Sequence, residues 1–382
     1  MNPPELRVAL FSGNYNYVRD GANQALNKLV DYLERQGVAV RVYSPTSERP
    51  AFEPSGTLIS VPSFRIPGRS EYRFAMPLNP DTRRDLEAFA PNLVHLSAPD
   101  ALGNSVKKWA KEAGVPVVAS VHTRFETYFA FYGLGWVRRW AERHLRRFYG
   151  DLAEIYATSE GFADVLRSQG MSDRIRVWSR GIDRTRFFPG RRDLAWRKTM
   201  GIGRSEIAIA FVGRLVLEKG LDVVAATMAE LTRRDIPHRL LVVGDGPARA
   251  KFAAQVPEAV FTGFLGGDAL PRAYASADMM INPSTTETFG NVTLEAMASG
   301  LPVVAARATG NDCLVDDGVT GALVPPGNAK AFADAIATLI ADPVARAAAG
   351  QAGVERASTY DWDAINGALL GHYRAVVANF AS

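Results

Sequence analysis

Two glutamates flank a glycine in the segment 287–295 of the second half of the chain. The apolar run 279–282 precedes this segment and helical periodicity begins at Asn291, so the segment is predicted to join a strand to a helix. Gly290 lets the chain turn tightly and lets a ligand approach the backbone. The first amides of the helix are unpaired donors with partial positive charge, which suits a diphosphate.

The two carboxylates at the ends of this segment could hold hydroxyl groups. Glu295 lies four residues beyond Asn291, on the same helix face, and its carboxylate can accept two hydrogen bonds from a ribose diol. Glu287 stands in the loop before the helix, where it could hold hydroxyls of a sugar. The alternative for Glu295 is an acid that stabilises the helix dipole. Spacing and the strand-loop-helix context favour the binding site.

Two cations follow another predicted strand, which ends at Gly213. Arg214 and Lys219 lie in its loop, and a helix is predicted to begin near Asp222. Preplaced cations stabilise the negative charge that builds on a leaving diphosphate, and each charge-assisted bond contributes ~1.5–3 kcal/mol. The alternative is a solvated loop, which would be preferred if this motif stood alone.

A third strand end carries the turn Gly244-Asp-Gly246-Pro. A tight turn into a helix explains these glycines about as well as a direct contact with a ligand. Gly244 and Gly246 are therefore supporting candidates only.

These loops need a scaffold of parallel strands, and the chain alternates short apolar runs with longer helical stretches throughout, which is typical of an α/β fold. Helices are predicted at 22–36, 161–169 and 362–380, among others. Strands are predicted at 6–11, 38–42, 57–61, 93–96, 115–121, 155–158 and 175–178, then at 207–212, 240–243, 260–262, 279–282 and 303–305.

The length of 382 residues favours two domains. We predict one Rossmann-like domain at 1–185, a second at 186–361, and a terminal helix at 362–382 that could pack back on the first. Two doubly wound domains in tandem would face each other across a cleft, with ligands at the carboxyl ends of the strands.

Bulk composition narrows the classes of partner. The net charge of +4 and pI of about 9.1 suit anionic small molecules or an anionic membrane surface, but are too weak to indicate nucleic acid. Cys313 is the only cysteine, so a reducing compartment is expected. Neither a signal peptide nor a membrane span is recognised, and a cytoplasmic location is predicted.

Taken together, these motifs resemble glycosyltransferase family 4, which has the GT-B fold and transfers sugars with retention and without a metal. The resemblance covers essentially the whole chain and is most specific from 211 to 300. It implies that Arg214 and Lys219 bind the donor diphosphate, Glu295 the ribose and Glu287 the transferred sugar. Gly290, Asn291 and Val292 would contribute backbone amides.

The first half is similar to the same family. A polar loop at 14–22 enters a helix at Asp20-Gly21, where the family usually has two small residues; Asp20 is a variant that resembles the branch of lipid mannosyltransferases and sulfoquinovosyl transferases. His122, followed by Thr123 and aromatic residues up to Tyr128, is similar to that branch, where the histidine lies beside the transferred sugar. A buried structural histidine is the alternative for His122. The first domain would bind the acceptor.

No cofactor and no metal are expected. The one Asp-x-Asp sequence, 361–363, stands at a predicted helix start, where N-capping by Asp361 explains it better.

The segment 136–149 predicts an amphipathic helix with Val137, Trp140, Ala141, Leu145 and Phe148 on its apolar stripe and arginines opposite. A surface helix packed on the first sheet is one interpretation, and weak docking on anionic lipid is the other, worth ~1 kcal/mol per basic residue.

The resemblance implies a retaining hexosyltransferase that uses a nucleotide sugar, GDP-mannose first, with a lipid or glycan acceptor. A UDP-hexose or UDP-uronate donor is the alternative. A non-catalytic nucleotide-sugar-binding protein is the alternative of another class. A dehydrogenase is disfavoured because the loop after the first strand, 11–16, lacks the Gly-x-Gly-x-x-Gly pattern. A nucleotide-sugar epimerase fits the paired glutamates less well than transfer does.

Overall fold

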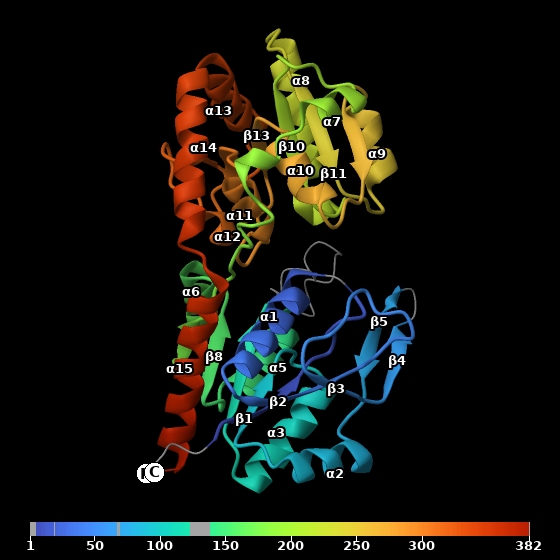
Figure 1. The fold of residues 1–382 in the computed structure, drawn as a ribbon, viewed down its shortest axis with the longest axis vertical. Coiled ribbons are helices and arrows are strands. Elements are labelled where there is room, and N and C mark those ends of the chain that lie inside the picture. Colours follow the sequence, from blue (N-terminus) through green and yellow to red (C-terminus); the bar gives the residue numbers. More distant parts are fainter. Residues whose placement is uncertain (1–4, 19, 67–68, 123–137, 382) are drawn as a thin grey trace. The chain divides into compact units, whose positions relative to one another are not determined.

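The computed structural model describes residues 5–18, 20–66, 69–122 and 138–381 of the protein. The chain divides into two compact units. Unit 1 contains the described residues up to Arg180 together with 362–381, and unit 2 contains residues 181–361 (Figure 1). The division falls after Arg180, a few residues before the boundary expected after residue 185.

Unit 1 is built on a seven-stranded parallel sheet with the order β3-β2-β1-β6-β7-β8-β9. Its strands are largely buried and apolar, as expected where helices cover both faces of a parallel sheet. The sequence order reverses direction at β1, as in a doubly wound fold. The strands are β1 (Arg7–Phe11), β2 (Ala39–Ser44), β3 (Thr57–Ser60), β6 (Leu93–Leu96), β7 (Val117–Val121), β8 (Glu154–Ala157) and β9 (Ile175–Val177).

The helices of unit 1 bury apolar stripes against this sheet. In α1, for example, Leu26, Leu29, Val30 and Leu33 recur at helical spacing and are buried. The described helices are α1 (Gly21–Arg35), α2 (Pro80–Phe89), α3 (Ala101–Ala113), α5 (Arg138–Tyr149), α6 (Glu160–Ser168) and α15 (Trp362–Ala381).

Helix α15, the last of the chain, packs against α1 (Figure 1). Asp363 pairs with Arg35 at the end of α1, with 2.7 Å between Oδ1 and Nη2. The indole Nε1 of Trp178 donates to Asn366 Oδ1 at 3.1 Å. The second carboxylate of the Asp-x-Asp sequence is thus held in an ion pair within unit 1.

Helix α5 differs from its prediction at one position. Ala141, Leu145 and Phe148 are buried, but Trp140 is 66% exposed and stacks on His144 at 5.8 Å. Trp140 precedes Ala141 by one residue, so its direction differs by about 100° from the buried stripe. Val137, which was also assigned to that stripe, lies outside the described residues, as do residues 123–136.

Three described strands were not predicted. β4 (Ser63–Ile66) and β5 (Arg69–Ala75) form an antiparallel hairpin separate from the main sheet. Phe64 and Phe74, 53% and 41% exposed, pair across it, so large apolar side chains of the hairpin face solvent and the alternation that marks a half-buried strand is weak. β15 (Gly321–Val324) is a short edge strand that begins with glycine, a weak strand former.

Unit 2 contains a six-stranded parallel sheet with the order β12-β11-β10-β13-β14-β15. Its other strands are β10 (Ala208–Val212), β11 (Arg239–Val243), β12 (Val260–Gly263), β13 (Met279–Asn282) and β14 (Val303–Ala306). Its helices are α7 (Leu194–Thr199), α8 (Leu221–Arg233), α9 (Arg249–Gln255), α10 (Ala269–Ala275), α11 (Asn291–Ala298), α12 (Thr309–Asp312), α13 (Ala329–Ala341) and α14 (Pro343–Ser358). Both units are Rossmann-like, as predicted.

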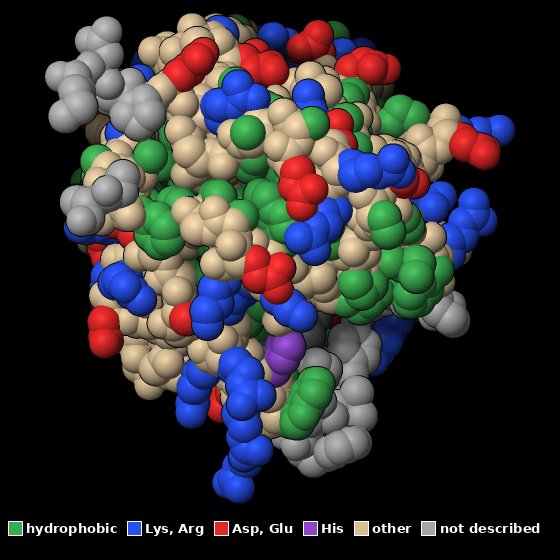
Figure 2. Space-filling model, turned by 90° about the horizontal axis from the view of Figure 1, so that it is seen from below, with side chains coloured by type: hydrophobic (Ala, Val, Ile, Leu, Met, Phe, Trp, Pro, Cys, Tyr) green, Lys and Arg blue, Asp and Glu red, His purple; other side chains and the backbone are tan. Residues whose placement is uncertain are grey.

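The surface carries charges of both signs. In the space-filling view of Figure 2, basic and acidic side chains both occur across the face shown. Several pair along helices, such as Arg83 with Glu87, one turn apart, at 2.8 Å. Such exposed pairs contribute little to stability. Within the part of the chain that the structure describes, no helix is long and apolar enough to span a bilayer.

Candidate active site

The carboxyl ends of β10, β11, β13 and β14 lie at one edge of the unit 2 sheet, because neighbouring parallel strands end on the same side. The loops that leave this edge carry most of the predicted site residues. The structure therefore groups segments that are up to about a hundred residues apart in sequence.

Lys219 and Glu287, predicted from separate motifs, form an ion pair between Nζ and Oε1. Their side chains are only 28% and 17% exposed. The loop of Lys219 packs against Pro283, the residue after β13. Gly220 in this loop has φ +70°, and an added Cβ there would lie 3.1 Å from Pro283. The tertiary fold thus brings a cation and a carboxylate together beside the loop 283–290.

Gly290, the N-cap of α11, has φ +97°, a left-handed conformation that favours glycine. No side chain caps this helix end, and Asn291 and Val292 are partly exposed. The first amides of α11 are therefore available as donors for an anionic group; that they bind the donor diphosphate stays a prediction.

Glu295 lies one turn into α11 and accepts a hydrogen bond from the buried Tyr274 hydroxyl at 2.9 Å. Burial raises the pKa of Glu295 to about 7, against the lowering effects of the Tyr274 bond and the charge of Arg186. Tyr274 and Arg186 were not predicted as neighbours of Glu295. Tyr274 belongs to α10, and Arg186 lies near the beginning of unit 2. No short-range sequence pattern links either residue to α11.

A buried polar network, the unit 2 network, lies beneath these loops. Asn282 Nδ2 donates to Thr293 Oγ1 and to Asn311 Oδ1, both at 3.0 Å. Asn311 Nδ2 in turn donates to the carbonyl of Ala306 at 3.0 Å. Buried amides with satisfied hydrogen bonds fix the relative position of the elements that carry them. The network ties the end of β13 to α11 and α12, and sequence reasoning missed it.

Gly310 was also missed. An added Cβ at Gly310 would lie 2.6 Å from the Cβ and the carbonyl oxygen of Glu287, so the backbone of α12 closely approaches the Glu287 loop. The one sequence signal was the Thr-Gly-Asn run after strand β14, which by itself is an ordinary turn.

The Gly244 turn acts as a backbone support for the Arg214 loop. A Cβ at Gly244 would lie 1.9 Å from the carbonyl oxygen of Gly213, and one at Gly246 would lie 2.4 Å from that of Leu215. The amide of Leu215 donates to the Asp245 carbonyl at 2.9 Å. Of the two readings left open, the structure supports a packing role for both glycines.

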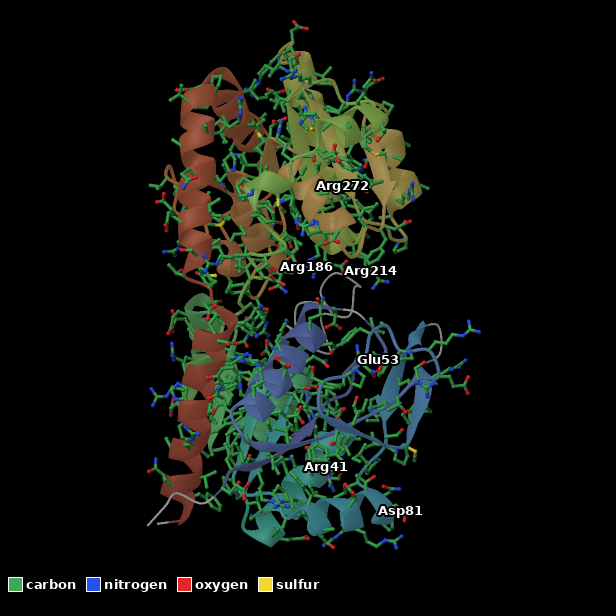
Figure 3. The ribbon with its side chains drawn as sticks, in the orientation of Figure 1. Arg41, Glu53, Asp81, Arg186, Arg214 and Arg272 are labelled. Carbon is green, nitrogen blue, oxygen red and sulfur yellow. The ribbon has the colours of Figure 1, made fainter. Side chains whose placement is uncertain are left out.

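Arg214 itself is exposed. Figure 3 shows Arg214 and Arg186 at the same end of unit 2. The guanidinium groups of Arg186 and Arg214, together with Lys219, therefore lie at the edge of the unit 2 sheet that also carries the two glutamates.

In unit 1, Asp20 is the N-cap of α1, which begins at Gly21. Its Oδ1 accepts from the Asn23 amide at 2.8 Å, and its Oδ2 accepts from the Asn23 side chain at 2.9 Å. Burial raises the pKa of Asp20, partly offset by these bonds and by the charge of Arg180. Asp20 thus caps the N-terminal end of α1.

His122 follows β7 and has both ring nitrogens engaged within unit 1. Nε2 lies 2.9 Å from Ser120 Oγ and Nδ1 lies 2.6 Å from Arg180 Nη2. Burial, together with the charges of Arg180 and His95, holds the pKa of His122 well below its usual range. The ring is neutral, so a hydrogen bond to a sugar would require one of these contacts to give way. Thr123 to Tyr128 lie outside the described residues.

A cavity of about 960 Å³ opens within unit 1 beside His122. Polar groups of Ser12, Ser97 and Asp100 share its lining with apolar side chains of Phe74 and Leu145. It can receive a molecule with both a polar and an apolar part.

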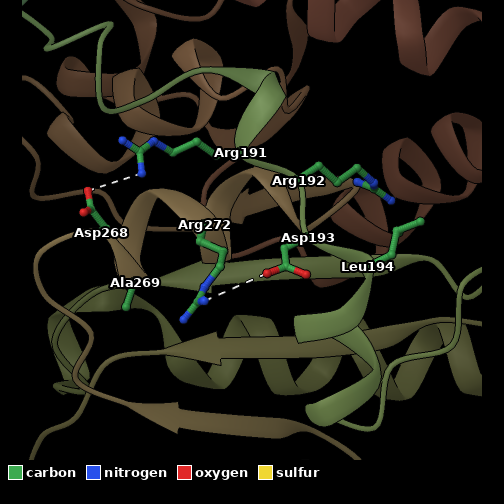
Figure 4. A pocket seen from close by; sticks show the side chains of 7 residues that line it. All are labelled: Arg191, Arg192, Asp193, Leu194, Asp268, Ala269 and Arg272. Carbon is green, nitrogen blue, oxygen red and sulfur yellow. Dashed lines mark hydrogen bonds and ion pairs between the residues drawn. The ribbon is translucent and has the colours of Figure 1, made fainter.

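A second pocket, of about 490 Å³, lies in unit 2 (Figure 4). Arg191 pairs there with Asp268 at 3.2 Å and Arg272 with Asp193 at 3.9 Å, so its charges largely neutralise one another. None of the predicted site residues lines it. Among the described residues, no group of three or more His, Cys, Asp or Glu is placed to hold a metal ion.

Two Rossmann-like units in one chain are the architecture of the GT-B class of glycosyltransferase. Residues 19–186 match the family described as Glycosyltransferase Family 4, and residues 206–342 match Glycosyl transferases group 1.

Similar proteins with assigned names are also sugar transferases. A GDP-mannose-dependent alpha-mannosyltransferase of Mycolicibacterium smegmatis is 34% identical over 97% of this chain and 98% of its own. One of Corynebacterium glutamicum is 30% identical over 98% and 90%. A sulfoquinovosyl transferase of Arabidopsis thaliana is 32% identical over 94% and 71%.

The solved sucrose-phosphate synthase of Thermosynechococcus elongatus shares the fold, with a TM-score of 0.82 at 21% identity, over 98% of this chain and 100% of that one. The chain belongs to glycosyltransferase family 4 and is a glycosyltransferase with the GT-B fold. The alternative of a non-catalytic binding protein is thereby set aside.

Proposed function

We propose that this enzyme transfers mannose from GDP-mannose to a lipid or glycan acceptor with retention of configuration and without a metal ion. The observation that carries the proposal is the grouping of Lys219, Glu287 and Glu295 at one strand edge of unit 2. Similarity to two GDP-mannose-dependent alpha-mannosyltransferases over nearly the full length supports the choice of donor.

Each group has a role that its chemistry suits. Arg214, Lys219 and the first amides of α11 bind the diphosphate and stabilise its growing charge as the glycosidic bond breaks. Glu295 accepts hydrogen bonds from the ribose, and Glu287 holds hydroxyls of the transferred sugar. Because Lys219 pairs with Glu287, the donor enters a site in which both charges are already oriented.

The unit 1 cavity is the proposed acceptor site. Its mixture of apolar and polar side chains suits an amphiphilic acceptor such as a glycolipid. A UDP-hexose or UDP-uronate is the second candidate donor, favoured by the similarity to a sulfoquinovosyl transferase, whose name specifies an acidic sugar.

The test begins with donor binding. The thermal stability of the purified protein is measured against GDP- and UDP-sugars in the presence of EDTA. A donor at 100 times its dissociation constant stabilises the native state by ~2.7 kcal/mol, which is readily measured. Glu295→Ala is expected to abolish the shift, whereas Glu258→Ala, at an exposed carboxylate outside the site, keeps it. A shift by UDP-sugars alone would contradict GDP-mannose as the donor.

Turnover is tested next, with radiolabelled donor and a panel of glycolipid and oligosaccharide acceptors. An α-linked product, assigned by the one-bond coupling between its anomeric carbon and proton in NMR spectra, is expected from GDP-mannose. Rates in EDTA are expected to equal those with added magnesium. Loss of activity in EDTA that magnesium restores would overturn the metal-independent mechanism.

We also propose weak docking of α5 on anionic membranes. Arg139, Arg143, Arg146 and Arg147 are exposed on this helix, and Trp140 projects beside them. Each basic residue near an anionic surface contributes ~1 kcal/mol, and salt screens this attraction. Sedimentation with phosphatidylglycerol vesicles should show binding at low salt that weakens as salt rises. Arg143→Glu with Arg147→Glu should abolish it, and Arg83→Glu, on α2, should not. No binding at low salt would contradict the proposal.

A further inference from the structure

A row of hydrogen-bonded side chains, the unit 1 network, runs through the buried interior of unit 1. It comprises Tyr373 on α15, His95 on β6, Ser120 on β7, then His122 and Arg180. The Tyr373 hydroxyl contacts His95 Nδ1. His95 Nε2 lies 2.8 Å from Ser120 Oγ, and the contacts of Ser120 and Arg180 with His122 complete the row.

The protonation of His122 follows from Arg180. A guanidinium only donates, so His122 Nδ1 accepts and the ring proton is on Nε2. Nε2–H then donates to Ser120 Oγ. His95 contacts Ser120 through Nε2 and Tyr373 through Nδ1. Burial holds the pKa of His95 at about 3, so this ring is also neutral.

Arg180 is an unusual end for such a network. It is 3% exposed, and its guanidinium donates to the carbonyls of Trp178 and Ser179 and lies 4.8 Å over the Trp178 ring. No carboxylate of the described residues is within ion-pair distance of it, and burial lowers its pKa to about 9, against the raising effect of the charge of Asp20. A buried cation whose hydrogen-bond partners are neutral is costly, and such groups concentrate at functional sites.

We infer that Tyr373, His95 and Ser120 are positioning residues for sugar transfer, which fix His122 as the neutral Nε2–H tautomer and hold Arg180 beside it. In this state His122 serves neither as a general base nor as an imidazolium. The inference rests on the proposed function, since the reaction positioned is the transfer described above.

The first test reads the tautomers directly and needs no activity. The protein has five histidines, so ¹⁵N-histidine labelling gives few ring signals in long-range ¹H–¹⁵N spectra at neutral pH. His122 is expected to be protonated on Nε2 only and His95 on one ring nitrogen only, assigned through His122→Asn and His95→Asn. An imidazolium at His122, or protonation of its Nδ1, would overturn the inference.

The second test separates positioning from folding. Ser120→Ala and Tyr373→Phe each interrupt the network and are expected to lower kcat roughly 10- to 100-fold, the scale on which small misplacements of positioned groups act. The donor KM should change far less, because the donor contacts in unit 2 are intact. If Ser120→Ala does not fold, Tyr373→Phe, which removes one buried oxygen, still decides the matter.

Tyr156→Phe is the matched control. Tyr156 is as buried as Tyr373 and its ring is 6.1 Å from that of His95, but its hydroxyl donates to Glu154 at 3.0 Å, outside the network. It should keep the wild-type kcat and tautomers. Wild-type kcat in folded Tyr373→Phe and Ser120→Ala would contradict the inference alone, whereas a wild-type protein that binds and turns over no nucleotide sugar would contradict the proposed function.

Discussion

Glu295 illustrates how the surroundings of a single residue set its chemistry. As an isolated glutamate it would be ionised at neutral pH, but burial raises its pKa to about 7. The ionised form offers more acceptor sites to the hydroxyl groups of a ribose than the protonated form, in which one oxygen carries a proton. Donor binding should therefore weaken as the pH falls below about 7.

The same pKa shift predicts how stability depends on pH. The folded pKa is raised above the ordinary value of 4.5, so the contribution of Glu295 is fully present below about pH 4.5 and is lost as the pH rises through about 7. Glu295→Gln should remove the part of the decline in stability with rising pH that comes from Glu295. The melting temperature of both proteins, measured from pH 4.5 to 8, tests it; identical slopes would contradict the raised pKa.

Lys219 and Glu287 should be interdependent. Removing either member takes away the ion-pair partner of the other, partly buried charge, which is costly. Lys219→Met and Glu287→Gln are each expected to lower kcat/KM by roughly 10²–10³-fold, as loss of a preorganised charge does. The double variant should be little worse than either single one. Lys251→Met, on α9 away from the pair, should retain activity; multiplicative losses in the double variant would argue for independent roles.

At the scale of elements, the loops of the unit 2 edge support one another through backbone packing. Gly244 has φ +141° and no space for a Cβ against Gly213. Gly244→Ala should lower the free energy of unfolding by about 1–3 kcal/mol, the usual cost of overpacking, and should weaken donor binding by displacing the Arg214 loop.

The control for Gly244→Ala is Gly371→Ala in helix α15, where an added Cβ meets nothing within 4 Å. This change should be neutral or stabilise by about 0.5–1 kcal/mol, because alanine favours helices. Urea unfolding of both variants measures the difference. Equal free energies of unfolding for the two variants would show that the backbones at Gly244 and Gly213 move apart easily to accept the added Cβ.

At the scale of the whole molecule, the last helix of the chain completes the first unit. Leu369, Leu370, Tyr373, Val376 and Val377 of α15 join the buried core that includes β1 and α1. Unit 1 therefore requires residues from both ends of the chain, with all of unit 2 inserted between them.

Leu370→Ala should consequently destabilise unit 1 by about 2–5 kcal/mol, the range for a buried leucine. Hydrogen exchange should become faster in α1 and β1 than in the strands of unit 2. Arg374→Ala, at an exposed position of the same helix, should leave both units unchanged. Equal loss of protection in the two units would contradict an independent core in unit 1.

Local sequence determined much of this protein. Apolar runs located most strands of both sheets within a few residues, because buried parallel strands are continuous and apolar. The start of α11 at Asn291 followed from a glycine and the helical period after it. The residue types and spacing of Arg214, Lys219, Glu287 and Glu295 indicated the family, which the relatives confirm; their individual roles stay predictions.

Only the tertiary structure decided which distant residues meet. It joined Lys219 to Glu287, set Tyr274 against Glu295, and linked Tyr373 to His95 across most of the chain. It also turned Trp140 outward and gave the Gly244 turn a packing role. Hydrophobic periodicity reports the burial of an element, whereas a hydrogen bond between distant side chains depends on strand order and helix packing, which no short segment contains.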